Sequence, residues 1–166
     1  MKSAQTSAVL PVRHSPAAVQ PCPDLVVIDH SNQAARAARI HLMKIIKAVI
    51  ADDDAVTRYL LRTLLRQRAI DVVGEASNGK GALQKCASEN PDVLFLDINM
   101  QEMDGFETLD CIRETMPGLA VIMISSDSTA GNVQKAHAQG ADGFIVKPFS
   151  PARVFEAIGR CVRISD

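Results

Sequence analysis

Short apolar runs and amphipathic stretches alternate five times after Met43, and this alternation limits the fold more than any other feature of the sequence. Runs of aliphatic and β-branched residues are typical of strands that are buried on both faces of a parallel sheet. Helices with right-handed crossovers join such strands and cover both faces of the sheet. The sequence therefore predicts an α/β fold with a doubly wound, five-stranded parallel sheet. The strands are expected at residues 45–51, 71–75, 93–97, 120–125 and 143–146.

Apolar residues recur at helical spacing between these strands, which predicts helices that bury one face. Asp54 and Ser150 are suitable N-caps, Pro151 suits a first helical position, and Gly140 suits a helix end. The helix expected at residues 129–139 has few apolar residues, so we expect it to be weakly held and able to switch between positions. The first helix has the apolar stripe Val56, Leu60, Leu61, Leu64 and Leu65, and the last has Val154, Phe155, Ile158, Cys161 and Val162.

Polar side chains follow four of the five predicted strands. Asp52 and Asp53 follow the first strand, Asp97 ends the third, Ser125 ends the fourth and Lys147 follows the fifth. In a doubly wound sheet, ligands bind beyond the carboxyl ends of the strands. We therefore expect these five side chains to lie close together at one edge of the sheet.

The chemistry of this group indicates phosphoryl transfer. Three close carboxylates repel one another by about 4 kcal/mol per pair at an effective dielectric constant near 20. Such a cluster requires either a cation or a raised pKa of one of the acids. A set of oxygen ligands suits Mg²⁺. Lys147 and Ser125 offer a positive charge and a hydroxyl donor for phosphoryl oxygens, and an aspartate such as Asp97 can accept a phosphoryl group.

Composition excludes several other classes of protein. The chain has a formal net charge of −1, so no overall field favours nucleic acid or an acidic membrane. The four arginines at positions 58, 62, 66 and 68 are expected to form a solvated helix face. No segment approaches the roughly 20 apolar residues of a membrane-spanning helix. The four cysteines have no metal-binding spacing. A reduced, cytoplasmic protein without membrane insertion is expected.

Four stretches in order resemble the response-regulator receiver family, in particular its CheY-like single-domain members. They read AVIADDDAVTRYLLRTLL, PDVLFLDINMQEMDG, VIMISS and GADGFIVKPF, within residues 45–164. The resemblance implies strand order 2-1-3-4-5, and a phosphorylation-activated switch of a two-component signalling system. It also implies phosphoryl transfer from a histidine kinase or phosphotransfer protein, with no catalysis on other substrates.

The same resemblance assigns roles to single residues. It implies that Asp97 is the phosphoacceptor, and that Ser125 and Lys147 contact the phosphoryl group. It implies Mg²⁺ ligation by Asp53 directly, Asp52 through water, Asp97, and the backbone carbonyl of Asn99. Ser125 and Phe144 correspond to the switch residues of the family: an aromatic residue turns inward as the hydroxyl of the fourth strand moves toward the phosphoryl group.

The sequence departs from the family at the rim of this site. Gln101 replaces a frequent Pro, and Ser126 replaces a usual Ala, which is expected to alter access of the phosphodonor. Asn99 and Asp127 resemble the pair that positions the hydrolytic water in relatives that reset quickly. We therefore predict a short-lived phosphoryl state.

Two alternatives belong to other functional classes. A haloacid-dehalogenase-like phosphohydrolase would also use an aspartate nucleophile, but on its first strand and with a cap domain, and it would turn over phosphomonoesters. A phosphorylation-independent interaction module would retain the fold and would not respond to beryllofluoride with Mg²⁺.

The ends of the chain differ in character. Residues 1–42 are expected to be a flexible N-terminal extension, or to lie upstream of a true start at Met43, and residues 43–166 to form the receiver domain. No output domain is expected. The signal is therefore expected to pass to a downstream protein through the helix at 129–139, the strand at 143–146 and the last helix.

Overall fold

A computed structural model describes residues 45–162; residues 1–44, which include the expected extension, lie outside the described part of the chain, as do residues 163–166. The elements alternate as the sequence predicts. The strands are β1 (Lys47–Ala51), β2 (Asp71–Ala76), β3 (Val93–Asp97), β4 (Ala120–Ser125) and β5 (Gly143–Val146). The helices are α2 (Ala55–Arg66), α3 (Gly79–Glu89), α4 (Gly105–Thr115), α5 (Ala130–Ala138) and α6 (Pro151–Cys161).

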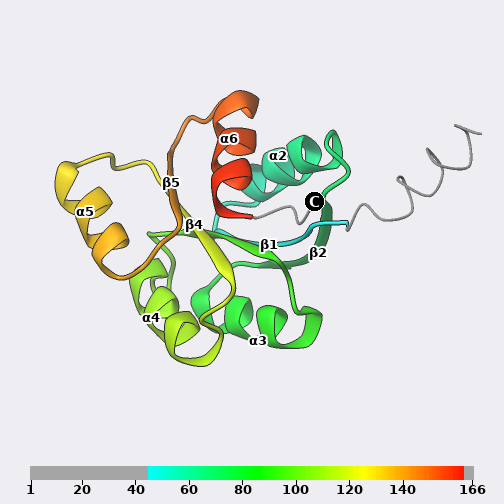
Figure 1. Ribbon diagram of the computed structural model, residues 1–166. Helices are drawn as coiled ribbons and strands as arrows, with labels where there is room; N and C mark the ends of the chain where they lie inside the picture. The colour runs from blue at the N-terminus through cyan, green and yellow to red at the C-terminus, as the bar shows by residue number, and fades with distance from the viewer. Residues whose placement is uncertain (1–44, 163–166) are drawn as a thin grey trace, which may run out of the picture. The chain divides into compact units, whose positions relative to one another are not determined.

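All strand pairings are parallel, and the order across the sheet is β2-β1-β3-β4-β5 (Figure 1). The doubly wound sheet and its predicted order are confirmed. Every residue of β3 and β4 is buried, as expected for strands that helices cover on both faces. β2 and β5 form the two edges of the sheet.

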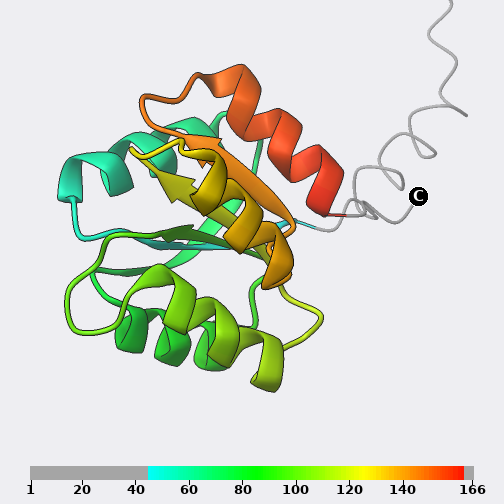
Figure 2. The ribbon, with the colours of Figure 1, turned by 90° about the vertical axis from the view of Figure 1, so that its left-hand side faces the viewer.

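Two hydrophobic layers hold the helices to the sheet. Helices α2 and α6 pack on one face, and α3, α4 and α5 pack on the other (Figures 1 and 2). The first layer includes Leu61 and Leu65 of α2, and the second includes Leu109 and Ile112 of α4. Each layer is continuous from β1 across β3 and β4, so the strand ends are held rigidly relative to one another.

Side chains cap the helices where the sequence predicts. Asp54 accepts hydrogen bonds from Val56 N and Thr57 N at the start of α2, and Ser150 accepts one from Arg153 N at the start of α6. The pKa of Asp54 is lowered, chiefly because the Val56 amide stabilises the carboxylate. These caps fix where each helix leaves the strand before it.

Three expectations about α2 and β1 are wrong in detail. The first strand begins at Lys47 rather than Ile45, and Ile45 is exposed. Val56 and Leu60 were expected in the core, but they are 64% and 49% exposed. The buried row of α2 is instead Thr57, Leu61 and Leu65, spaced four residues apart. Both rows are apolar in part, so periodicity alone does not decide which one faces the sheet.

Candidate functional site

The carboxyl end of β1 places two acids differently. Asp52 is completely buried, its backbone N–H donates to Ala76 O of β2 at 3.1 Å, and its Oδ1 accepts from Asp54 N at 2.9 Å. Asp53 is exposed. One acid is thus built into the sheet and the other faces solvent.

Arg58 fixes the backbone of this acidic turn from α2. Its Nη1 donates to the carbonyl oxygens of Asp52 at 2.7 Å and Asp53 at 3.3 Å, while its Nε lies 3.5 Å from Glu75 Oε2. Arg62 pairs with the same glutamate at 2.8 Å. The expectation of a solvated arginine face is therefore wrong for these two residues. The sequence offers one signal that was missed, a glutamate at the end of the neighbouring strand.

Lys147 joins the acids of β1 and β3. Its Nζ lies 2.8 Å from Asp97 Oδ1, as a hydrogen bond, and 2.7 Å from Asp52 Oδ2. The second contact is an ion pair with a completely buried carboxylate. Residues 50 positions apart in the chain therefore meet at one edge of the sheet, as the sequence predicts.

Burial and nearby charges shift the pKa values of Asp97 and Lys147. Burial raises the pKa of Asp97, which is 3% exposed, and the nearby Asp52 carboxylate adds to the effect; the Lys147 ammonium opposes it. Burial by itself lowers the pKa of Lys147, but the carboxylates of Asp52 and Asp97 outweigh it and the net shift is upward. Lys147 therefore remains a fixed positive charge between two buried acids.

The oxygen donors fit a divalent cation. Ligand oxygens of Asp52, Asp53 and Asp97 all lie within 4.8 Å of one another. Carboxylate oxygens, one of them open to solvent, are the ligands that Mg²⁺ takes while it keeps several waters. Asn99 follows β3, and its backbone N–H donates to Asp97 Oδ2 at 2.8 Å. Ligation by the Asn99 carbonyl stays a prediction.

Gly105, the first residue of α4, packs directly against the backbone of Asp97 and Ile98 at the end of β3. Gly105 N donates to Ile98 O at 2.9 Å, and a β-carbon at this position would overlap with the backbone oxygen of Asp97. Gly105 is thus a residue of the site that the sequence indicates only as part of an Asp-Gly turn. Gln101 and Ser126 are both exposed at the rim.

Ser125 and Asp127 lie at the end of β4. Ser125 is completely buried; its backbone oxygen accepts from Lys147 N at 2.8 Å, and its Oγ accepts from Asp127 N at 3.0 Å. Asp127 accepts from Thr129 N at 2.9 Å and from Asn132 Nδ2 at 3.1 Å. The Asp127 carboxylate is therefore engaged with α5, and its role in positioning water stays a prediction.

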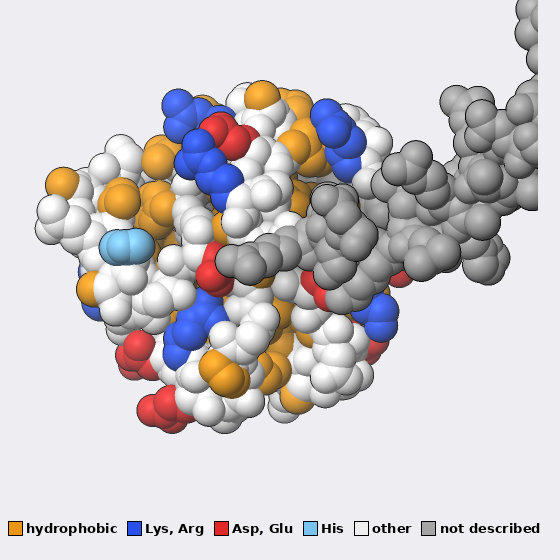
Figure 3. Space-filling view, in the orientation of Figure 1, with side chains coloured by type: hydrophobic (Ala, Val, Ile, Leu, Met, Phe, Trp, Pro, Cys, Tyr) orange, Lys and Arg blue, Asp and Glu red, His pale blue; other side chains and the backbone are white. Residues whose placement is uncertain are grey.

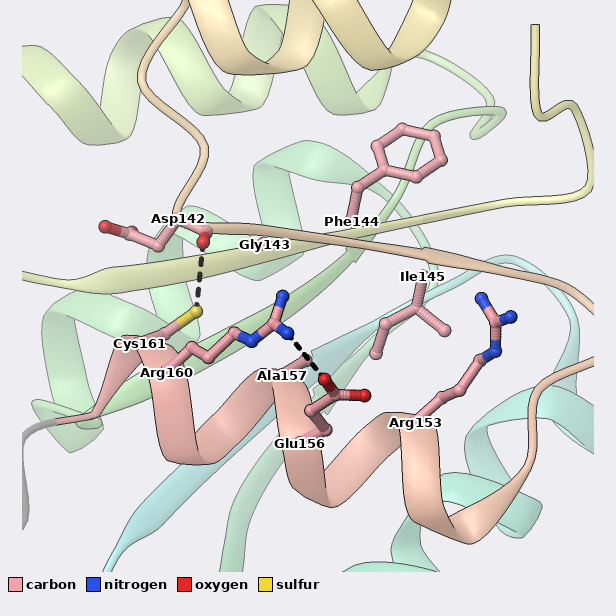
Figure 4. A pocket seen from close by; sticks show the side chains of 9 residues that line it. All are labelled: Asp142, Gly143, Phe144, Ile145, Arg153, Glu156, Ala157, Arg160 and Cys161. Carbon is pink, nitrogen blue, oxygen red and sulfur yellow. Dashed lines mark hydrogen bonds and ion pairs between the residues drawn. The ribbon is translucent and has the colours of Figure 1, made fainter.

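Phe144 of β5 packs against the α3, α4 and α5 side of the core and is partly buried. It lines a hollow of about 170 Å³ beneath α5, together with Val133, Ala136 and the exposed His137. In Figure 4 its ring points away from α6. The hollow leaves space beside the ring, which the switch role expected of Phe144 requires; that role stays a prediction.

A second hollow, of about 180 Å³, lies between β5 and α6 (Figure 4). Arg160 pairs with Glu156 at 2.6 Å, and Cys161 Sγ donates to Asp142 O at 3.1 Å. Arg153 has no charged partner among the residues that the structure describes. This groove is separate from the acidic site.

On the face shown in Figure 3, acidic and basic side chains are interspersed, and neither sign dominates.

The fold and this site together define a receiver domain. Residues 48–159 match the response regulator receiver domain, and the chain belongs to that family. It is 39% identical to the chemotaxis protein CheY of Listeria monocytogenes over 118 residues, which is 71% of this chain and 99% of CheY. It is 38% identical to CheY of Bacillus subtilis over 114 residues, 69% of this chain and 95% of that one.

Solved structures agree with this assignment. The response regulator domain of CheB from Thermotoga maritima matches with a TM-score of 0.67 and 30% identity, over 74% of this chain and 100% of that one. A CheX–CheY–BeF₃–Mg²⁺ complex from Borrelia burgdorferi matches with a TM-score of 0.66 and 31% identity, over 68% and 86%. The chain is therefore the receiver domain of a CheY-like response regulator, a class that binds Mg²⁺ at an acidic pocket. No helix within residues 45–162 is long and apolar enough to cross a bilayer.

Proposed function

We propose that the protein accepts a phosphoryl group on Asp97 from the phosphohistidine of a kinase or phosphotransfer protein. The observation that carries this proposal is the buried Asp97 carboxylate, which Lys147 holds at 2.8 Å beside the acids of β1. A carboxylate oxygen attacks phosphorus, the bond between phosphorus and the donor's imidazole nitrogen breaks, and an acyl phosphate forms. The haloacid-dehalogenase-like alternative has no support from the family match, and Asp97 ends β3 rather than β1.

Each residue of the site has a separate task in this reaction. Lys147 offsets negative charge on Asp97 and on the incoming phosphoryl oxygens. Ser125 offers its hydroxyl proton from the neighbouring strand end. Asp52, Asp53 and Asp97 would hold Mg²⁺, which when bound would neutralise charge on the carboxylates and the phosphoryl group.

Labelling by acetyl phosphate in the presence of Mg²⁺ tests this proposal. Intact mass spectrometry should show one added phosphoryl group, which is lost in Asp97→Asn and strongly reduced in Asp53→Asn. Asp71→Asn is the matched control, since Asp71 is an exposed acid at the start of β2, far along the strand from the site. A wild-type chain that stays unlabelled, or an Asp97→Asn variant that is labelled as well as wild type, contradicts the proposal.

The phosphodonor protein is proposed to dock on an apolar patch of α2. Val56, Tyr59 and Leu60 are 64%, 59% and 49% exposed and lie three and four residues apart on one face of the helix. The patch starts two residues after Asp54, so it borders the acidic rim that a donor must reach. Exposed apolar side chains grouped in this way are typical of interaction surfaces.

A comparison of two donors isolates this docking contact. The cognate histidine kinase is first identified by profiling the organism's kinases. Leu60→Glu should then slow phosphotransfer from this kinase about tenfold or more. Labelling by acetyl phosphate should not change, because this donor is too small to contact α2. Val133→Glu, at an exposed apolar position of α5, is the control. Equal transfer rates in wild type and Leu60→Glu argue against docking at this patch.

The signal is proposed to leave through α5, β5 and α6. β5 is an edge strand between two helices that bury few side chains, and the groove of Figure 4 lies beside it. A downstream protein that contacts this face would meet the hollow under α5 on one side and Arg153 on the other.

A further inference from the structure

One side chain of α2 holds both of the peptide groups that flank Asp53. Arg58 Nη1 donates to Asp52 O at 2.7 Å, in the peptide before Asp53, and to Asp53 O at 3.3 Å, in the peptide after it. The backbone of a residue has only two soft dihedral angles, which are set by the planes of its two peptide groups. Arg58 therefore fixes the direction in which the Asp53 side chain leaves the backbone.

This constraint matters because Asp53 is the exposed member of the acidic cluster. Asp52 is completely buried and Asp97 is 3% exposed, so close packing holds both of them. Asp53 is exposed, and packing does not hold its side chain in the same way. A binding group that is held in place beforehand loses less freedom on binding and binds more tightly. Restraint of the Asp53 backbone should therefore favour binding of a cation.

Glu75 of β2 holds Arg58 in this position. Its Oε2 lies 3.5 Å from Arg58 Nε, and its Oε1 accepts from Arg62 Nη1 at 2.8 Å. The side chains of Arg58 and Glu75 are only 20% and 28% exposed. The carboxylate also offsets part of the positive charge of the guanidinium groups, which would otherwise disfavour a cation nearby.

A shift in strand register aims Glu75 at α2. The pairing of β2 with β1 passes over Val73, because Val72 and Gly74 pair with consecutive residues of β1. Side chains alternate between the two faces of a strand, and one extra residue reverses this alternation for the residues that follow. Glu75 consequently lies on the face of the sheet that α2 covers, within reach of Arg58.

We propose that Arg58 and Glu75 are positioning residues for the divalent cation and set the affinity of the acidic site for Mg²⁺. Arg58 acts through the backbone of Asp53, and Glu75 acts through Arg58. This inference rests on the magnesium site within the proposed function, and it does not depend on phosphoryl transfer to Asp97.

Positioning and charge predict opposite effects when Arg58 is removed. Loss of a positive charge close to the site would by itself strengthen binding of a cation. Loss of the hydrogen bonds that orient a metal ligand weakens metal binding, typically by about 10- to 100-fold. The direction of the change in Mg²⁺ affinity therefore distinguishes the two effects.

Titration of the full chain with Mg²⁺, followed by backbone amide NMR well below the midpoint Tm of unfolding, tests the proposal. Arg58→Ala should bind Mg²⁺ about tenfold or more weakly than wild type. Arg66→Ala removes an exposed arginine from the last turn of the same helix and should bind as wild type does. Unchanged or tighter binding by Arg58→Ala overturns the proposal. A wild-type chain that does not bind Mg²⁺ overturns the magnesium site itself, and this proposal with it.

Arg58→Lys keeps the test decisive if Arg58→Ala does not fold. Lysine retains the charge, but one ammonium nitrogen cannot replace the two guanidinium nitrogens that contact the carbonyl oxygens and Glu75. This variant should bind Mg²⁺ about threefold or more weakly than wild type. Equal binding would mean that only the charge matters, and it overturns the proposal. A lower Tm in EDTA with unchanged Mg²⁺ affinity would mean that Arg58 only stabilises the fold, and it also overturns the proposal.

Discussion

Charge balance at the acidic site is set by single residues. Three carboxylates lie with oxygens within 4.8 Å of one another, and Lys147 contacts only two of them, Asp52 and Asp97. Asp53 therefore adds a negative charge that no ammonium group in the described part of the chain offsets. The folded protein carries this repulsion until a cation binds.

Asp53→Asn should consequently stabilise the protein in metal-free buffer. Removal of one charge from this cluster is expected to raise the free energy of unfolding by roughly 1 kcal/mol. This is less than the repulsion of about 4 kcal/mol between two close charges near a protein surface, because Asp53 faces solvent. In wild type, Mg²⁺ should add stability, and in Asp53→Asn it should add much less. Urea unfolding with EDTA or with Mg²⁺ measures both effects. Equal stabilisation of the two proteins by Mg²⁺ would place the ion elsewhere.

Cys86 of α3 is a buried thiol whose chemistry is suppressed. Burial raises its pKa to about 12 from the ordinary value of 9.0, and its side chain is completely inaccessible. The unfolded chain loses this proton at lower pH than the folded one, so this thiol should make stability fall as pH rises from about 9 toward 12.

At pH 8 the native protein should be alkylated at the partly exposed Cys111 long before Cys86, as peptide mapping can show.

Helix α2 has two rows of apolar side chains, one buried against the sheet and the other exposed to solvent. Leu61 lies in the core with no exposed surface, whereas the adjacent Leu60 is 49% exposed in the patch proposed to receive the phosphodonor. The inward row holds the helix to the sheet, and the outward row remains for a partner.

The same substitution at these neighbouring positions should separate the two tasks. Leu61→Ala is expected to lower the free energy of unfolding by about 3 kcal/mol, because it removes a buried side chain and leaves a cavity. Leu60→Ala should cost less than about 1 kcal/mol. Urea unfolding of the two variants provides the measurement, and each is the control for the other. Similar costs would mean that Leu60 is also part of the core.

Strand-helix alternation made the elements predictable from the sequence, and polar residues at the strand ends made most of the site predictable. Asp52, Asp97 and Lys147 meet as expected because parallel strands align their carboxyl ends. Arg58 was misread, since its role depends on Glu75, a residue of a different element that only the folded sheet brings near. Contacts of this kind have no signature in local spacing.

At the scale of the whole molecule, the buried residues described for both hydrophobic layers and the acids Asp52, Asp53 and Asp97 lie in the part of the chain that matches the receiver family. Residues 48–159 contain the match to the family, and CheY of Listeria monocytogenes aligns over 99% of its length with 118 residues of this chain. We propose on this basis that residues 43–166 form the receiver domain and that residues 1–42 are an extension.

A chain that begins at Met43 should therefore fold and respond as the full chain does. Its Tm is expected to lie within about 3 °C of the full chain's value, because removal of segments outside a core usually changes stability by no more than a few tenths of a kcal/mol. Its affinity for beryllofluoride with Mg²⁺ should also be the same, since Asp52, Asp53, Asp97 and Lys147 all remain in the shortened chain. Calorimetry of both chains, with and without these ligands, makes the comparison. A large loss of Tm would show that residues 1–42 belong to the folded domain, and a change in affinity alone would show that they act on the site.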